Sequence, residues 1–158
     1  MSKTKVSVVI LAKNEESRIK DCLQSVAGWA DEIIVIDDES IDKTVVISTE
    51  LNANVFIKKM DIEGAHRNWA YSKARNSWVL SLDADERATP ELKEEISQLI
   101  SKNPSQNAFT IPRRNHIGNY WLRWGGQYPS AQIKLFRKEK FKWEEVEVHP
   151  RAILQGEC

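Results

Sequence analysis

Ser77-Trp78-Val79-Leu80-Ser81-Leu82-Asp83-Ala84-Asp85-Glu86 is a short apolar run that ends abruptly in two carboxylates separated by one small residue. Runs of this length that are rich in valine, leucine and aromatic residues are typical of strands buried on both faces of a sheet. We therefore predict a buried strand over residues 78–82. Asp83 and Asp85 then follow its carboxyl end, which is where open α/β sheets bind their ligands.

The spacing of Asp83 and Asp85 suits a shared ligand. Alternate residues of an extended chain point to the same side, and Ala84 between them is small. Two unpaired carboxylates this close repel each other, whereas a divalent cation bound by both relieves the repulsion. The alternative is a polar strand end whose aspartates cap the next helix. The D-x-D tripeptide alone leaves both interpretations open.

Strand-like and helix-like segments alternate along the chain around this stretch. The expected strands cover residues 6–12, 32–36, 54–58 and 78–82, and the expected helices cover 17–27, 42–51, 64–76 and a segment that begins at Pro90 with Thr89 as its N-cap. This βαβαβαβα order predicts an α/β fold with a mostly parallel central sheet and helices on both faces.

Three polar clusters follow the predicted parallel strands. They are Asn14 with Glu15, Asp37 with Asp38, and Asp83 with Asp85. Because the carboxyl ends of parallel strands share one edge of a sheet, we expect all three clusters to converge on a single crevice. Crowding carboxylates without partners is costly, which favours a binding site at this edge.

The pattern changes after Pro104. Strands are expected over residues 108–112 and 132–137, and between them residues 113–131 contain Trp121, Trp124, two tyrosines and three glycines. A connection of this length in a compact domain is functional or mobile, so we interpret it as a lid. The alternative is an apolar patch that packs against further chain. We expect one domain over residues 1–158.

Composition excludes several classes of protein. The 158 residues suit one soluble domain, and 23 basic against 23 acidic residues give no electrostatic reason to expect nucleic acid as a partner. No apolar run is long enough for a transmembrane helix, and the first residues lack the apolar core of a signal peptide. We expect Cys22 and Cys158 to be free thiols in a reducing compartment, and therefore a cytoplasmic protein.

Four segments, in order, resemble the inverting glycosyltransferases of family 2, which have the GT-A fold. They are V-S-V-V-I-L-A-K-N-E from Val6, I-V-I-D-D-E-S from Ile34, G-A-H-R-N-W-A from Gly64 and V-L-S-L-D-A-D-E from Val79. The similarity is greatest to the bacterial branch that builds lipopolysaccharide core and related surface glycans, and a weaker match continues to His149. Enzymes of this branch continue for many tens of residues further, so we expect a C-terminally truncated chain.

The resemblance implies that residues 1–104 form the nucleotide-sugar-binding half of the domain and that residues 105–158 begin its acceptor-binding half. Ala12, Asn14 and Glu15 would flank the nucleotide, and either Asp37 or Asp38 would accept a hydrogen bond from the uracil N3–H. Arg67 would face the base or the diphosphate. Asp83 would approach the ribose or a metal-bound water, and Asp85 would bind the Mg²⁺ or Mn²⁺ that bridges the diphosphate.

The resemblance also implies an acceptor site and a general base. The base is expected well after the D-x-D, where Glu144, Glu145 and Glu147 are the candidates, and we favour Glu145. The alternative is a solvated strand face. We predict that Trp121, Trp124, Glu144 and Glu147 contact the acceptor. His149 is a candidate third metal ligand beside Asp83 and Asp85, or an acceptor-site residue.

The expected function is transfer of a sugar from a UDP-sugar, with UDP-glucose as the candidate, to a glycan or lipid-linked acceptor with inversion. Peripheral association with the inner face of the plasma membrane is expected through the missing C-terminal part. One alternative is a nucleotide-sugar-binding module without turnover. The other is a receiver-like signalling domain, which places its acidic pair after the first strand and has no D-x-D.

Overall fold

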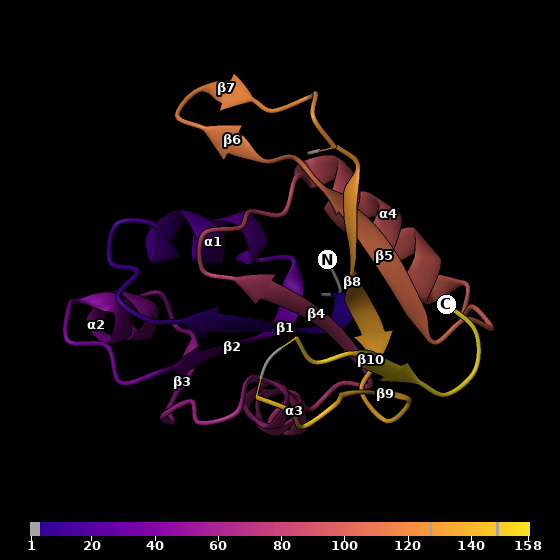
Figure 1. Cartoon of the computed structure of the whole chain (residues 1–158), viewed down its shortest axis with the longest axis horizontal. Coiled ribbons are helices and arrows are strands. Elements are labelled where there is room, and N and C mark those ends of the chain that lie inside the picture. Colours follow the sequence, from indigo (N-terminus) through magenta and orange to yellow (C-terminus); the bar gives the residue numbers. More distant parts are fainter. Residues whose placement is uncertain (1–3, 127, 148) are drawn as a thin grey trace.

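The computed structural model describes residues 4–126, 128–147 and 149–158, and its centre is a six-stranded sheet (Figure 1). The strand order is β3-β2-β1-β4-β8-β5. Strands β1 to β4 are parallel, β8 runs antiparallel to β4, and β5 runs antiparallel to β8. The strands are β1 (Thr4–Ala12), β2 (Ala30–Asp37), β3 (Asn54–Ile57), β4 (Trp78–Asp83), β5 (Ala108–Arg113) and β8 (Ser130–Arg137). The predicted α/β fold with a mostly parallel sheet is confirmed.

Four helices connect the strands: α1 (Ile19–Val26), α2 (Thr44–Glu50), α3 (Glu63–Ser72) and α4 (Pro90–Ser101). Helix α1 buries Ile19, Cys22, Leu23 and Val26, which are the apolar positions that its spacing predicts. Helix α4 begins as predicted, because the Thr89 hydroxyl accepts a hydrogen bond from the Leu92 amide at 3.2 Å. The aspartates of the D-x-D therefore do not cap this helix, and that alternative is wrong.

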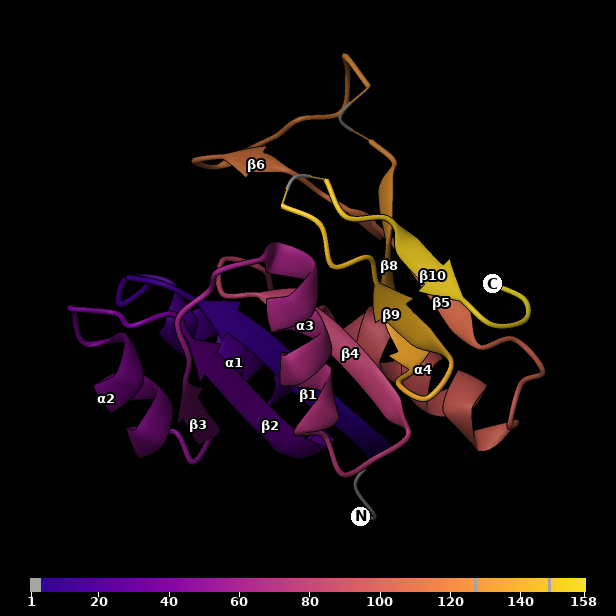
Figure 2. The ribbon, with the colours of Figure 1, turned by 60° about the horizontal axis from the view of Figure 1, so that its bottom comes forward.

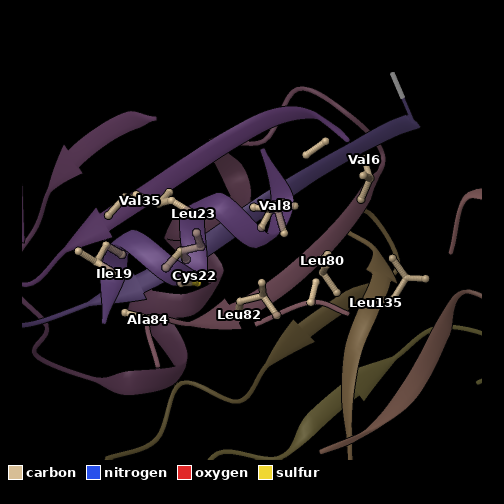
Figure 3. Packing of buried hydrophobic residues seen from close by; sticks show 14 of the residues in the cluster. Val6, Val8, Ile19, Cys22, Leu23, Val35, Leu80, Leu82, Ala84 and Leu135 are labelled. Carbon is tan, nitrogen blue, oxygen red and sulfur yellow. The ribbon is translucent and has the colours of Figure 1, made fainter. Parts of the chain in front are cut away.

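The sheet is covered on both faces, as predicted. Helices α1, α2 and α4 contribute to the core on one face, where Leu80 of β4 lies beside its sheet partner Leu135 of β8 (Figure 3). The other face is covered by α3 and a hairpin of β9 (Phe141–Trp143) and β10 (Ala152–Leu154) (Figure 2). The sequence analysis missed this hairpin, because strands of three residues are too short to show alternation.

The segments on either side of Pro104 share one sheet. Strand β8 pairs with β4, with Leu80 opposite Leu135, and the neighbouring Phe136 points to the other face, where its ring stacks on Phe141 at 4.1 Å. The sheet therefore runs through both proposed halves of the domain. As a result, β8 brings its side chains beside the strand that ends in the D-x-D.

Residues 113–131 contain a small hairpin instead of an irregular loop. Strands β6 (His116–Ile117) and β7 (Tyr120–Trp121) pair antiparallel, and the hairpin projects away from the central sheet (Figure 1). Trp121 contacts the Tyr128 ring edge-to-face at 5.2 Å, whereas Trp124 is 87% exposed. The segment is not packed into the core, and its role as a lid stays a prediction.

Helix α3 lies unusually close to the chain that follows β9. A Cβ atom on the buried Gly64 would clash with the backbone carbonyl oxygen of Glu144. Asn68 fixes the same approach, because its side chain donates to the Trp143 carbonyl at 2.9 Å and accepts from the Trp143 amide at 2.8 Å. Gly64 thus permits the contact that places residues 143–145.

We expect Gly64→Ala to lower the free energy of unfolding by about 1–3 kcal/mol, because the added methyl group must push helix α3 and the Glu144 backbone apart. The higher helix propensity of alanine acts in the opposite direction, because it favours alanine over glycine by about 1 kcal/mol. Urea denaturation measures the effect, with Lys20→Ala on the exposed side of α1 as the control. A Gly64→Ala variant as stable as the parent chain would contradict this close packing.

Candidate functional site

The carboxyl ends of β1, β2 and β4 lie side by side at one edge of the sheet. Ala12 at the end of β1 pairs with Asp37 of β2, and Leu11 pairs with Asp83 of β4. The Asp38 amide donates to the Ala12 carbonyl at 2.9 Å, and the Ala84 amide donates to the Leu11 carbonyl at 3.1 Å. The predicted convergence of the polar clusters on one edge is confirmed.

Asn14 and Glu15 join the loop after β1 to the loop after β2. The Asn14 amide donates to the Ser40 hydroxyl at 2.7 Å, and the Asn14 side chain accepts from the Ile41 amide at 2.9 Å. The Glu15 amide donates to the Thr44 hydroxyl at 2.8 Å. Asn14 has a φ of 53°, a conformation that asparagine tolerates better than most residues. These contacts hold the two loops in one arrangement beside the strand ends.

Asp37 and Asp38 have different surroundings. Asp37 is fully buried, and one of its oxygens accepts from the Ser40 amide at 2.8 Å. Asp38 accepts from the Met60 amide and from the ammonium of Lys13, both at 2.8 Å. The Lys13 side chain is 61% exposed and is therefore free to move into solvent. Asp38 is consequently the carboxylate of this pair that a ligand can engage by displacing one exposed lysine.

The pKa of Asp38 reflects these contacts. Burial raises it, but the hydrogen bonds from Lys13 and from the Met60 amide, together with the Lys13 charge, lower the pKa below its ordinary value. Asp38 is therefore an ionised acceptor at neutral pH.

Asp83 is paired with two cations. Its carboxylate lies 3.2 Å from the ammonium of Lys134 and 3.6 Å from the guanidinium of Arg67. Burial raises the pKa of Asp83, but Lys134 and Arg67 lower it more, so that the net shift is downward. The expectation that the two aspartates repel each other without partners is therefore wrong for Asp83.

Arg67 belongs to the site and is not a solvated charge on the surface of α3. Its side chain is only 18% exposed and lies between Asp83 and Glu63, whose carboxylate it contacts at 2.9 Å. Burial lowers the pKa of Arg67, while Tyr71, Asp83 and Glu63 raise it to a net value above the ordinary one. Arg67 therefore keeps its positive charge next to the D-x-D.

Asp85 differs from Asp83 in its exposure. The Asp85 side chain is 52% exposed, and its ion pair is a long one, 3.9 Å from the guanidinium of Arg18. The D-x-D thus presents one carboxylate that is engaged inside the protein and one that faces solvent. Only the second can bind a new cation without breaking a close ion pair.

Lys134 belongs to the candidate site and was not predicted from the sequence. It is 5% exposed in β8, and its ammonium donates to Asp83 at 3.2 Å and to Glu86 at 2.8 Å. Glu86 also accepts from the Asp83 amide at 2.9 Å, so Lys134 holds the turn that carries Asp85. The available signal was a lone lysine inside the apolar run from Ile133 to Phe136, where a solvated side chain is out of place.

The thiol of Cys22 packs beneath this turn. It donates to the Asp83 carbonyl at 3.7 Å, and burial raises the pKa of Cys22 to about 12. Cys22 and Cys158 are both free thiols, as predicted. The buried Cys22 is a packing residue and not a reactive nucleophile.

The donors at this edge fit a cation that is shared with a ligand, and they do not form a closed protein cage. Within residues 4–126, 128–147 and 149–158, no three histidine, cysteine, aspartate or glutamate side chains come together as a metal site. The trio of Asp83, Asp85 and His149 is thus not assembled. His149 instead lines a pocket of about 450 Å³ with Arg67 and Lys134. Mg²⁺ commonly binds one or two protein carboxylates together with substrate phosphates. Asp85 can supply such a carboxylate.

The base candidates lie on the loop between β9 and β10. Glu145 accepts from the Asn68 side chain at 3.3 Å and lines a second pocket with Asn68 and Phe141. Glu144 accepts from the Arg151 amide at 3.2 Å, and Glu147 is exposed. The described residues that line the first pocket, beside Arg67 and Lys134, include none of the three. Glu144 and Glu145 lie instead beside helix α3, against Gly64 and Asn68.

Residues 7–153 match the model of the family described as glycosyl transferase family 2. The chain belongs to this family. Its GT-A fold is the one predicted from the sequence, and a receiver-like signalling domain is excluded. A glycosyltransferase of Rickettsia bellii that has no assigned function is 41% identical over 103 residues, which are 65% of this chain and 34% of that protein.

Two further proteins are similar to this chain. The lipopolysaccharide core biosynthesis glycosyltransferase LpsC of Rhizobium meliloti is 23% identical over an alignment of 160 positions, which covers 98% of this chain and 59% of LpsC. The fold is also that of glucosyl-3-phosphoglycerate synthase from Mycobacterium tuberculosis, crystallised with Mn²⁺, UDP and glucosyl-3-phosphoglycerate. That match has a TM-score of 0.51 and 21% identity, and covers 65% of this chain and 42% of the synthase.

The family 2 chain thus spans about a third of the length of the Rickettsia relative. No helix in the part of the chain that the structure describes is both long and apolar enough to cross a bilayer.

Proposed function

We propose that this chain binds a UDP-sugar and a divalent cation as part of an enzyme that transfers the sugar to a glycan or lipid-linked saccharide with inversion. The observation that carries the proposal is that the two carboxylates of the D-x-D have different surroundings. Asp83 is held by Lys134 and Arg67, whereas Asp85 faces solvent. The complex of glucosyl-3-phosphoglycerate synthase with UDP and Mn²⁺ supports the same choice of ligands.

The nucleotide is proposed to lie across the ends of β1 and β2. Asp38 accepts from the uracil N3–H after the exposed Lys13 moves away, because Asp37 is fully buried. Ala12, Asn14 and Glu15 flank the nucleotide, and Asp83 approaches the ribose or a metal-bound water.

The reaction needs charge compensation at the diphosphate. Sugar transfer develops positive charge at the anomeric carbon and negative charge on the departing diphosphate. Asp85 would hold a divalent cation there, which would supply Lewis-acid neutralisation of that negative charge. Arg67 adds a fixed positive charge beside Asp83, and Lys134 keeps the turn in place so that Asp85 points outward.

Glu145 is the proposed base, with Glu144 and Glu147 as alternatives, and Trp121 and Trp124 are the proposed acceptor contacts. A lipopolysaccharide-core saccharide is the proposed acceptor because LpsC, which matches 98% of this chain, is named for that pathway. UDP-glucose is the proposed donor. A binding module without turnover would share the donor contacts, and a turnover assay separates the two.

We expect UDP to raise the melting temperature more than ADP, GDP or CMP does in the presence of Mn²⁺, and EDTA to remove most of the shift. A ligand at a hundred times its dissociation constant stabilises the folded state by about 2.7 kcal/mol, which corresponds to roughly 5–10 °C in a chain of this size. Thermal-shift measurements with each nucleotide, with and without chelator, check this.

The preference for uracil over other nucleobases is tested with a pair of variants. Asp38→Asn should reduce the UDP shift toward that of the other nucleotides, because an amide presents one acceptor and one donor where the carboxylate presents two acceptors. Asp31→Asn, which changes an aspartate near the start of β2, is the control. Equal shifts for all four nucleotides in the parent chain would argue against a specific uracil site.

A further inference from the structure

The segment that carries the β6–β7 hairpin has an unusual charge. Residues 113–131 contain Arg113, Arg114 and Arg123 and no aspartate or glutamate, which gives the segment a formal charge of +3. The whole chain has a net charge of zero, from 23 basic and 23 acidic residues. The projection therefore carries a net positive charge in a chain that is neutral overall.

The hairpin also exposes large apolar side chains. Ile117 is 68% exposed, Tyr120 is 82% exposed and Trp124 is 87% exposed. The two views agree that the hairpin extends away from the sheet and its helices (Figures 1 and 2). No other described element of the chain covers these side chains, and the projection leaves them free to meet a flat surface.

Two of the arginines are held beside the partly buried Trp121. The guanidinium of Arg123 lies 4.3 Å from the centre of the Trp121 ring, and that of Arg114 lies 5.0 Å from it. Within the described ranges, the salt bridges include none between either arginine and a carboxylate. Arg113, by contrast, is paired with Glu86 at the base of the hairpin. The two stacked guanidinium groups are therefore available to an external anion.

This combination of groups is the one that an anionic lipid surface recognises. Tryptophan and tyrosine are favoured at the membrane–water interface, where an apolar ring meets polar headgroups. Lysine and arginine are attracted to anionic lipids, and an apolar insertion combined with a basic patch gives reversible attachment. An uncharged saccharide would use the aromatic faces but would gain nothing from a charge of +3.

We propose that the β6–β7 hairpin is a membrane-interface anchor, which inserts Ile117, Tyr120 and Trp124 among the headgroups of an anionic bilayer while Arg114 and Arg123 contact lipid phosphates. The anchor does not depend on donor binding, and it assigns Trp124 to the bilayer in place of the acceptor contact proposed above. The hairpin is nevertheless linked to the site, because β8 follows it in the chain and contains Lys134, which pairs with Asp83. The anchor and the candidate site are thus connected by one strand.

Flotation of the 158-residue chain with vesicles tests this proposal. We expect binding to phosphatidylcholine vesicles that contain about 30% phosphatidylglycerol and much weaker binding to pure phosphatidylcholine. Tyr120→Ser combined with Trp124→Ser should lower the partition coefficient about tenfold. Arg123→Gln should lower it about fivefold, the factor that corresponds to ~1 kcal/mol per basic residue at an anionic surface. Val46→Ser, which changes an apolar residue of α2 that is 54% exposed, should have no effect.

Melting curves and the UDP shift of each variant show that it is folded and still binds donor, so that failure of the anchor is distinguishable from failure of the donor site. Tryptophan quenching by brominated lipids should decrease in the Trp124→Ser variant if the tip enters the bilayer. Absence of vesicle binding, equal binding to neutral vesicles, or binding unchanged by the hairpin variants overturns the proposal. Self-association abolished by Trp124→Ser, without vesicle binding, would assign the hairpin to a second copy of the chain.

Discussion

Asp85→Ala is expected to abolish the metal-dependent part of UDP binding, a loss of roughly 100-fold in affinity or about 2.7 kcal/mol. Asp85 is the solvent-facing carboxylate of the D-x-D, with a side chain that is 52% exposed. Without it the cation loses its proposed direct protein ligand, and the diphosphate charge is left uncompensated. Calorimetric titration of UDP in the presence of Mn²⁺, and again in EDTA, measures the effect.

Asp83→Ala is the matched comparison, and it should weaken UDP binding less, because its proposed contact is to the ribose or through water. Its effect on stability should be the larger of the two. Asp83 pairs with Lys134 at 3.2 Å and with Arg67 at 3.6 Å, so its removal leaves two buried cations with fewer partners. Melting curves in EDTA separate binding from stability. An Asp85→Ala chain that still binds UDP with an undiminished metal requirement would show that the cation is held elsewhere.

Lys134→Met is expected to destabilise the chain by about 2–3 kcal/mol, although methionine has nearly the same length and suits a buried position. The Lys134 side chain is 7% exposed, and the substitution removes the closest cation from Asp83 and from Glu86, which it contacts at 2.8 Å. Arg67 and Arg113 remain near these carboxylates at 3.6 Å, which limits the loss. Urea denaturation measures it, with Lys102→Met at the exposed end of α4 as the control.

The cost of Lys134→Met should depend on pH. In the parent chain the pKa of Asp83 lies below its ordinary value of 3.8, so its contribution to stability is complete above pH 3.8 and is lost as the pH falls through the lower folded pKa. Without Lys134 the pKa of Asp83 rises, and the carboxylate takes up a proton at higher pH. The difference between the two chains should therefore be largest near neutral pH and shrink below about pH 4.

Lys134→Arg should restore most of the stability, because the positive charge is kept. It should restore UDP binding less completely if the position of the ammonium sets the turn that carries Asp85. Equal stability of the Lys134→Met and parent chains at neutral pH would mean that these ion pairs contribute nothing net. That result would also remove the reason for assigning Lys134 a positioning role.

The regular part of the fold could be predicted because its residues interact mainly with their neighbours in sequence or with the core as a whole. The run from Trp78 to Leu82 is buried on both faces, and Thr89 caps α4, as local pattern and capping chemistry predict. The gathering of Asp37, Asp38 and Asp83 at one edge also followed from the sequence. A parallel sheet aligns strand ends whatever the details of packing.

Tertiary structure alone decided which charged groups meet. Lys134 lies 51 residues from Asp83 and reaches it because β8 inserts antiparallel beside β4. That insertion gives the D-x-D one paired and one solvent-facing carboxylate. In the same way, Gly64 shows its role only where helix α3 meets the Glu144 backbone. Hydrophobic periodicity reports which residues are buried, but the partner of a buried charge depends on strand order, which a local pattern does not contain.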